Sequence, residues 1–204
     1  VHTFLYVWPM PEIREMIERE GLNVIGVDIH HLHTKEDAML ADPDHWVHQL
    51  PGGRFGENLI HPIYVLSSLI GDLEVDHVFT SKHGPHSWVP FDELAASFHS
   101  GDRHGRIHLS FNSPRWTTPL SLSVYAKEGI IHFDGSNVVL HRQGGLMKGY
   151  LPDEKIPRGK MFADRLKLAA GIVGSTAALG FQVMRHKLRP GHERLFQAFA
   201  RRLR

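Results

Sequence analysis

The sequence of 204 residues contains no cysteine. This absence excludes disulfide bridges, thiolate metal sites and cysteine nucleophiles, and it is compatible with the cytoplasm, where we expect the protein to work. An excess of one charge is also lacking, because the formal net charge is +1, so composition gives no electrostatic reason to bind nucleic acid. With 42% apolar residues the chain can bury a core without cross-links. We therefore expect one globular domain over residues 1–204.

Long hydrophobic runs are scarce as well. Leu168 to Met184 carries no formal charge and approaches the length of a bilayer-spanning helix, but Gly171 and Gly174 within it suit a buried helix equally well. We interpret this run as a helix of a soluble protein and expect no membrane partner. The chain opens on Val1 without a basic leader, so we also expect a fragment that is cut at both ends.

Hydrophobic periodicity divides the chain into helices and short strands. Helical spacing predicts helices over Pro11–Glu20, Leu59–Ile70, Met161–His186 and Gly191–Arg204. Alternating or β-branched segments predict strands over Val1–Trp8, Leu22–Thr34, Leu73–Ser81, Leu94–His99, Arg106–Asn112, Leu120–Ala126, Gly129–Asp134 and Val138–Arg142, although Leu94–His99 would also suit a helix. Tight turns between consecutive strands favour an antiparallel meander. The predicted fold class is therefore α+β, with an open, mostly antiparallel sheet and helices on one face.

The segment from Gly52 to Pro62 has the composition of a functional site. Glycines before a helix let the backbone approach a ligand, and an ionisable pair, Glu57 and His61, stands close to the start of that helix. A histidine there can take or give the proton of a substrate hydroxyl, while the carboxylate orients its ring. The alternative is structural, with Glu57 favoured by the helix dipole and His61 a partly buried histidine.

Pro62 limits what the local pattern can say about this pair. Proline lacks a backbone donor and fits only the first turn of a helix. We therefore expect the helix to begin near Leu59, with Asn58 as its cap. On that expectation a contact between Glu57 and His61 stays an open question.

The 17 histidines raise the question of a metal site. Alternation along a strand places His31 and His33 on one face and His30 with Asp28 on the other. Zinc needs three or four convergent ligands. Spacing alone does not bring further histidines to either group, the nearest pairs in sequence being His45 with His48 and His83 with His86. We assign no metal, and a histidine metal site stays an alternative.

Motifs spread over nearly the whole chain follow one known order. A tryptophan, a glycine pair, an acidic residue, a histidine four positions on and a helix ending in Gly-Asp occur as Trp46, Gly52, Gly53, Glu57, His61, Gly71 and Asp72. A predicted hairpin follows over Val124–Asp134 with its turn at Lys127 to Gly129, and the last motif consists of Gly191, His192, Leu195 and Phe199. This order resembles the C-terminal domain of the Gfo/Idh/MocA oxidoreductases, which are named for glucose-fructose oxidoreductase and inositol dehydrogenase.

The resemblance implies hydride transfer between a sugar or cyclitol carbon and NAD or NADP, with His61 as the general acid/base and Glu57 in the supporting acidic position. The residues expected at the substrate are Trp46, Arg54, Tyr64 and Arg115, although Arg115 could instead cap a sheet edge. The resemblance also implies a homodimer or homotetramer formed through the sheet, and we expect its interface to bury the small-residue and aromatic face that carries Tyr125.

Two family features are missing from the sequence. There is no Gly-x-Gly-x-x-Gly turn after an N-terminal strand, and no Glu-Lys-Pro segment of the kind that supplies the family's catalytic lysine. We therefore expect the cofactor to be bound mainly by an N-terminal Rossmann domain that is absent from this chain, and the chain alone to be inactive.

Two residues also depart from the family pattern. The family more often has Asp where Glu57 stands, and an Asp where this chain has Tyr64. These departures motivate a second hypothesis, a non-catalytic binding or assembly module that keeps the same fold.

Overall fold

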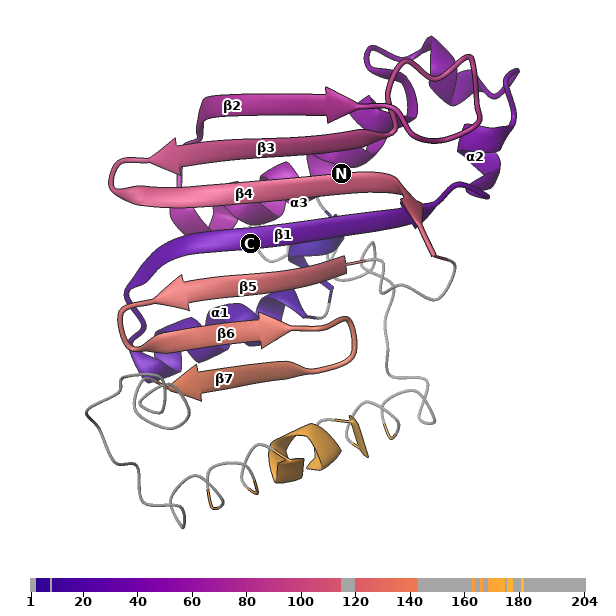
Figure 1. Ribbon diagram of the computed structural model, residues 1–204. Helices are drawn as coiled ribbons and strands as arrows, with labels where there is room; N and C mark the ends of the chain where they lie inside the picture. The colour runs from indigo at the N-terminus through magenta and orange to yellow at the C-terminus, as the bar shows by residue number, and fades with distance from the viewer. Residues whose placement is uncertain are drawn as a thin grey trace, which may run out of the picture. The chain divides into compact units, whose positions relative to one another are not determined.

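The computed structural model of the chain describes residues 3–7, 9–114 and 120–142, together with a few helical residues between 163 and 181 (Figure 1). These residues belong to two compact units. One unit is continuous, from Val24 to Ser123, and the other combines Val1–Asn23 with Val124–Arg204. The residues proposed for a site all fall within the bounds of the continuous unit, although Arg115 lies outside the described residues.

The continuous unit contains four strands and the longest described helix. In chain order its elements are β1 (Val24–Thr34), α2 (Ala38–Ala41), the 3-10 helix η2 (Trp46–Gln49), α3 (Gly53–Ile70), β2 (Glu74–Ser81), β3 (Glu93–Ser100) and β4 (Arg103–Ser113). β2, β3 and β4 form the predicted antiparallel meander. β1 pairs with β4 in parallel, with His30 opposite His108, so this part of the sheet is not a simple meander. The ambiguous segment Leu94–His99 is a strand, as predicted.

The other unit begins with a short helical turn. Its elements are the 3-10 helix η1 (Thr3–Leu5), α1 (Met10–Glu20), β5 (Leu120–Ala126, which the division between the units crosses), β6 (Gly129–Phe133) and β7 (Val138–Arg142). The strand predicted over Val1–Trp8 is therefore wrong, because the chain already turns there toward α1, with the Met10 N–H donating to the Val7 carbonyl at 3.1 Å. β6 and β7 form an antiparallel hairpin.

The residue after α1 fixes how the chain leaves this helix. Gly21 adopts a φ of 59°, a left-handed conformation that closes the helix. The Asn23 side chain and backbone N–H then donate to the carboxylate of Glu128, at 2.5 and 2.7 Å. The predicted turn between β5 and β6 is thus tied to the end of α1 within this unit.

The seven strands found among the described residues belong to one sheet in the order β2-β3-β4-β1-β5-β6-β7. The sheet is open and mostly antiparallel, which confirms the predicted α+β class. No helix in the described part of the chain is long and apolar enough to cross a membrane. The helix predicted over Gly191–Arg204 lies outside the described residues, and that over Met161–His186 is described only at scattered helical positions.

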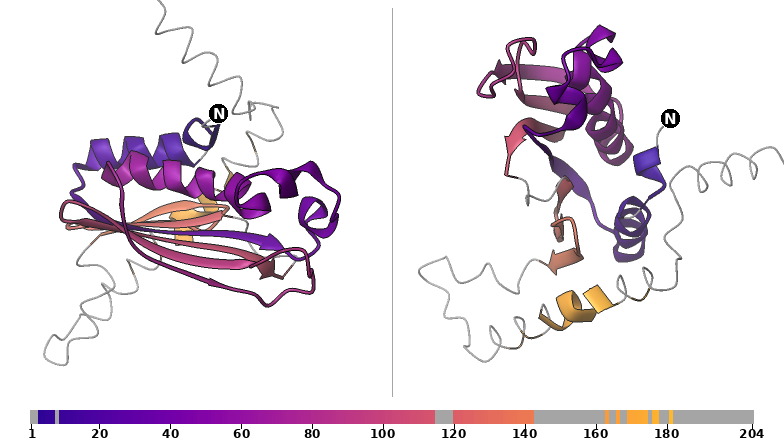
Figure 2. Two further views of the ribbon diagram at one scale, coloured as in Figure 1. Left: turned by 90° about the horizontal axis from the view of Figure 1, so that it is seen from above. Right: turned by 90° about the vertical axis from the view of Figure 1, so that its right-hand side faces the viewer.

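The core of the continuous unit lies between α3 and the strands beneath it (Figure 2). α3 buries one face, and β1 and β4 bury every second residue, as expected for a helix packed on a sheet. Gly105 of β4 allows close approach, because a Cβ there would stand 2.6 Å from a methyl carbon of the buried Leu66. This packing fixes the rotation of α3 about its axis, and with it the direction of the helix residues at the candidate site.

Candidate functional site

Helix α3 begins at Gly53 rather than near Leu59, which corrects the expected start. Gly52 caps the helix with a φ of 76°, and the Gly56 N–H donates to the Gly52 carbonyl at 3.0 Å. A Cβ on Gly56 would overlap the Pro51 carbonyl oxygen, so the tight entry requires glycine. Pro62 lies inside the helix and is buried, where the packing of α3 tolerates the loss of one backbone hydrogen bond.

The earlier start places the predicted catalytic pair on one helix face. Residues three, four and seven positions apart lie on the same side of an α-helix, so Arg54, Glu57, Asn58 and His61 share one face of α3. Burial lowers the pKa of His61, and the charge of Glu57 acts in the opposite direction without overcoming it. The imidazole of His61 is therefore neutral near neutral pH, beside a carboxylate that favours its protonated form.

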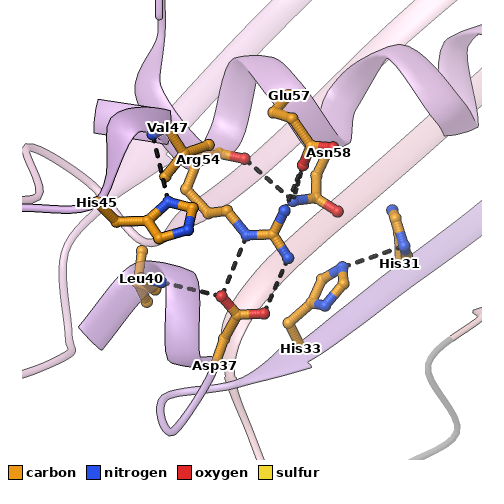
Figure 3. A network of polar contacts seen from close by, with 9 residues as sticks. All are labelled: His31, His33, Asp37, Leu40, His45, Val47, Arg54, Glu57 and Asn58. Carbon is orange, nitrogen blue, oxygen red and sulfur yellow. Dashed lines mark hydrogen bonds and ion pairs between the residues drawn. The ribbon is translucent and has the colours of Figure 1, made fainter. Parts of the chain in front are cut away.

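Arg54 forms the centre of a polar network (Figure 3). Its Nε and Nη2 donate to the two carboxylate oxygens of Asp37 at 3.1 and 2.9 Å, and its Nη1 donates to Glu57. The guanidinium also lies 5.8 Å from the centre of the Phe111 ring. The Arg54 and Asp37 side chains are only 10% and 16% exposed, so this is a largely desolvated, bidentate ion pair.

Asp37 also anchors the segment that follows β1. Its side chain caps the short helix α2 by accepting from the Leu40 N–H at 2.9 Å. Burial alone would raise the pKa of this carboxyl, but the hydrogen bonds and charge of Arg54 outweigh it and hold the pKa below its usual value. Asp37 therefore stays ionised at neutral pH and joins α2 to α3 through Arg54.

Asn58 completes the network on the helix. It is buried, and its side-chain amide donates to the Arg54 carbonyl at 3.1 Å and to the Glu57 carboxylate at 3.0 Å. Glu57 thus accepts from both Arg54 and Asn58. Its carboxylate is oriented by its neighbours on the same helix face.

Two histidines of β1 lie beside this network, as alternation along the strand predicted. The Nε2 atoms of His31 and His33 are 3.1 Å apart, and the His33 ring stacks on Phe111 at 4.8 Å between centroids. Burial, followed by the charge of His33, lowers the pKa of His31 to about 3, and burial also lowers the pKa of His33. Among the described residues no three potential ligands converge on a point where a metal ion could bind.

The other residues predicted at the substrate are more scattered. Trp46 is 56% exposed in η2, where its ring lies 5.5 Å from that of His45. Tyr64 lies on α3 one turn after His61 and is half-buried. Arg115 lies outside the described residues. Sequence reasoning missed Asp37 and Phe111 and wrongly expected Asn58 to cap the helix, whereas Asn58 lies inside α3. All three belong to the network only through contacts made in the folded chain.

Comparison with known proteins identifies the fold. No protein-family model matches the sequence, and no curated protein matches it in sequence. The WlbA dehydrogenase from Bordetella pertussis, solved with NADH and UDP-GlcNAcA, matches with a TM-score of 0.58 at 15% identity, over 96% of this chain and 57% of that one. The chain shares the fold of part of this dehydrogenase.

Two further solved structures agree. Levoglucosan dehydrogenase, solved with NADH and levoglucosan, matches with a TM-score of 0.57 at 15% identity, over 72% of this chain and 43% of that one. An inositol dehydrogenase homolog from Azotobacter vinelandii, solved with NAD+, matches with a TM-score of 0.50 at 16% identity, over 97% of this chain and 60% of that one. The resemblance seen in the sequence is thus confirmed at the level of the fold. The chain spans about half the length of the solved structures it matches.

Proposed function

We propose that the chain is the substrate-binding and catalytic half of an NAD- or NADP-dependent oxidoreductase that acts on a sugar, cyclitol or related hydroxy compound. The observation that carries this proposal is His61, one helical turn after Glu57, in a chain with the fold of NAD-binding oxidoreductases. Two of these proteins were solved with sugar ligands, UDP-GlcNAcA, which carries a carboxylate, and levoglucosan, which does not; they support a sugar-like substrate without fixing its charge.

In this proposal His61 handles the proton of the reacting hydroxyl. Oxidation of an alcohol carbon releases a hydride, which the nicotinamide ring would accept, and a proton, which a base must take. The lowered pKa of His61, caused first by burial, leaves its imidazole neutral and able to accept that proton. Glu57 stabilises the imidazolium that results, and in the reverse direction the same imidazolium returns the proton to the carbonyl oxygen.

The chain's own residues fit the substrate side of this reaction better than the cofactor side. Among the residues that the structure describes, no strand is followed by a glycine-rich turn and a helix of the kind that holds a dinucleotide. We therefore assign cofactor binding mainly to another part of the full-length protein, an N-terminal Rossmann domain. Within this chain, Trp46, Arg54, Tyr64 and Arg115 are the residues proposed to contact substrate.

Assembly and location complete the proposal. We propose a cytoplasmic homodimer or homotetramer that buries the sheet face carrying Tyr125, which is half-buried within this chain. The alternative is a binding or assembly module without chemistry, favoured by Glu57 and Tyr64 at positions where the family more often has Asp. The two hypotheses differ in whether the full-length protein reduces a nicotinamide cofactor.

The test measures NADH and NADPH formation by the full-length protein with a panel of sugars and cyclitols. His61→Asn should lower turnover by about 10²- to 10⁴-fold, the usual effect of losing a general acid/base. His104→Asn, an exposed histidine of β4 in the same unit, is the matched control and should retain turnover. Wild-type turnover by His61→Asn across the pH range would show that His61 is not the base. Absence of turnover from every panel member in the wild type would favour the non-catalytic module.

A further inference from the structure

The charges of the network bear on which substrate the proposed site accepts, and an inference from them rests on the proposed function. The cluster consists of Arg54, Asp37 and Glu57. Its positive charge in the described part of the chain is the Arg54 guanidinium, which forms ion pairs with both carboxylates. Asp37 takes Nε and Nη2, and Glu57 takes Nη1. Two carboxylates against one guanidinium leave the cluster with one net negative charge.

The histidines around the cluster do not offset that charge. The pKa values of His31, His33 and His61 are all lowered, in each case chiefly by burial. Their rings are therefore neutral near neutral pH. A neutral imidazole offers one N–H donor and one acceptor nitrogen, which suits hydroxyl groups. The same ring gives no Coulomb attraction to a carboxylate.

We propose that this site accepts an uncharged sugar or polyol ring and discriminates against the same ring carrying a carboxylate. The geometric basis is the pairing of Arg54 with Asp37 and Glu57, which balances its positive charge, so that a remaining N–H could reach a substrate hydroxyl while the guanidinium offers a carboxylate no unbalanced charge. The Arg54–Asp37 pair has no net charge and is largely shielded from water, so the net negative charge of the cluster lies on Glu57, whose side chain is 33% exposed and only partly screened by solvent. The described part of the site therefore repels an added negative charge.

The first experiment compares matched pairs of substrates in the full-length protein. Glucose with glucuronate, galactose with galacturonate and mannose with mannuronate differ only in a CH2OH group or a carboxylate at the same carbon. Formation of NADH or NADPH gives kcat/KM for each member. We expect the uncharged member of each pair that is turned over to be favoured by about 10-fold, the effect of one net charge at about 10 Å when the effective dielectric constant is about 20.

The second experiment changes the charge of the cluster. Asp37→Asn removes one carboxylate, leaves the cluster without net charge and releases Arg54 from a charged partner. It should shift the preference toward the carboxylate sugar by about 10-fold. The ratio is measured within one variant, so a partly unfolded fraction cancels. Asp28→Asn is the matched control, because Asp28 forms the same bidentate pair with Arg106, at 2.8 and 2.6 Å, on the other face of β1. It should leave the ratio unchanged.

The outcomes separate this inference from the proposed function. If the protein reduces the cofactor but has the higher kcat/KM with the carboxylate sugars, the inference is overturned and the oxidoreductase proposal stands. An unchanged ratio in folded Asp37→Asn would also overturn it. Should that variant fail to fold, as shown by circular dichroism, the wild-type ratios alone decide. No cofactor reduction with any panel member would defeat both proposals.

Discussion

The two faces of strand β1 carry the same kinds of side chain in different surroundings. On the side covered by α3, Asp37, which follows β1 and caps α2, pairs with Arg54, and the two side chains are 16% and 10% exposed. On the open face, Asp28 pairs with Arg106 through the same bidentate geometry, but the Arg106 side chain is 65% exposed. Bidentate geometry alone therefore does not distinguish a network built into the core from a surface ion pair. The exposure of the arginine does.

The histidines show the same contrast. His31, on the covered face, is 4% exposed and has a pKa lowered to about 3, first by burial and then by the charge of His33. His30, its neighbour on the open face, is exposed, and its ring meets that of His108 edge-on at 5.7 Å. Neighbouring positions of the strand thus hold one histidine that is shielded from water and one that is exposed to it. The covered face is where a fixed protonation state can be maintained, and it is the face of the candidate site.

The largest expected effect comes from removing Arg54. Arg54→Met should destabilise the protein by about 3–5 kcal/mol, because Asp37 and Glu57 would be left as neighbouring carboxylates with no guanidinium between them. Arg106→Met, on the open face, should cost no more than about 1 kcal/mol, as for an exposed ion pair. Urea denaturation of the two variants measures the difference. Equal losses would show that burial of the Arg54 network contributes nothing to stability.

The pH dependence of stability gives a second comparison of the two faces of β1, with a smaller expected effect on the free energy of unfolding. With a pKa of about 3 in the folded protein and the ordinary 6.5 in the unfolded chain, His31 binds a proton more readily when unfolded. Its contribution to the free energy of unfolding therefore falls as pH falls from about 6.5 to about 3 and is constant above that window. The slope reaches about 1.4 kcal/mol per pH unit.

Without this titration, His31→Phe should lose about 3 kcal/mol less stability than the wild type between pH 6.5 and pH 4, whatever its effect at pH 7. His30→Phe is the control on the open face. Partial burial also lowers the pKa of His30, but this residue is more exposed to solvent than His31, so the slope should change less. Denaturant titrations at several pH values provide both slopes. Parallel curves for wild type and His31→Phe would contradict the buried, neutral state of His31.

Local patterns predicted most elements of the fold because burial alternates along each strand and apolar residues recur along α1 and α3. They missed two features that depend on distant contacts. The parallel pairing of β1 with β4 joins segments separated by a helix and a hairpin, so no turn in the sequence marks it. The start of α3 was placed too late because Pro62 ordinarily marks a first turn, whereas here the buried face of the whole helix outweighs one lost hydrogen bond.

The candidate site was only half visible in the sequence. Glu57 and His61 stood out through their spacing and the family resemblance. Asp37 reaches Arg54 across 17 positions of chain, and such a pairing has no periodic signature. The face shared by His31 and His33 was visible from alternation, but their neutral state results from burial, which only the folded structure reveals.

The smallest expected effect comes from adding one methyl group on each face of the sheet, by replacing a glycine with alanine. Gly105 and Gly26 lie on neighbouring strands. A Cβ on Gly105 would stand 2.6 Å from Leu66, which is fully buried, whereas a Cβ on Gly26 would overlap the ring of His104, which is exposed and can swing away. Gly105→Ala should therefore cost about 1–3 kcal/mol, the usual penalty for overpacking a core. Gly26→Ala should stay within about 0.5 kcal/mol, because alanine is also better tolerated than glycine in a strand.

Thermal unfolding of the two alanine variants measures this difference, and a double-mutant cycle assigns its cause. If the Gly105→Ala penalty is a clash with Leu66, shortening that side chain should recover part of it. Gly105→Ala combined with Leu66→Val should then be less destabilised than the sum of the single variants, with a coupling of about 0.5 kcal/mol or more. Strict additivity would mean that the added methyl group is accommodated without displacing Leu66. The close approach of α3 to β4 would then not be what positions the helix face that carries Arg54, Glu57 and His61.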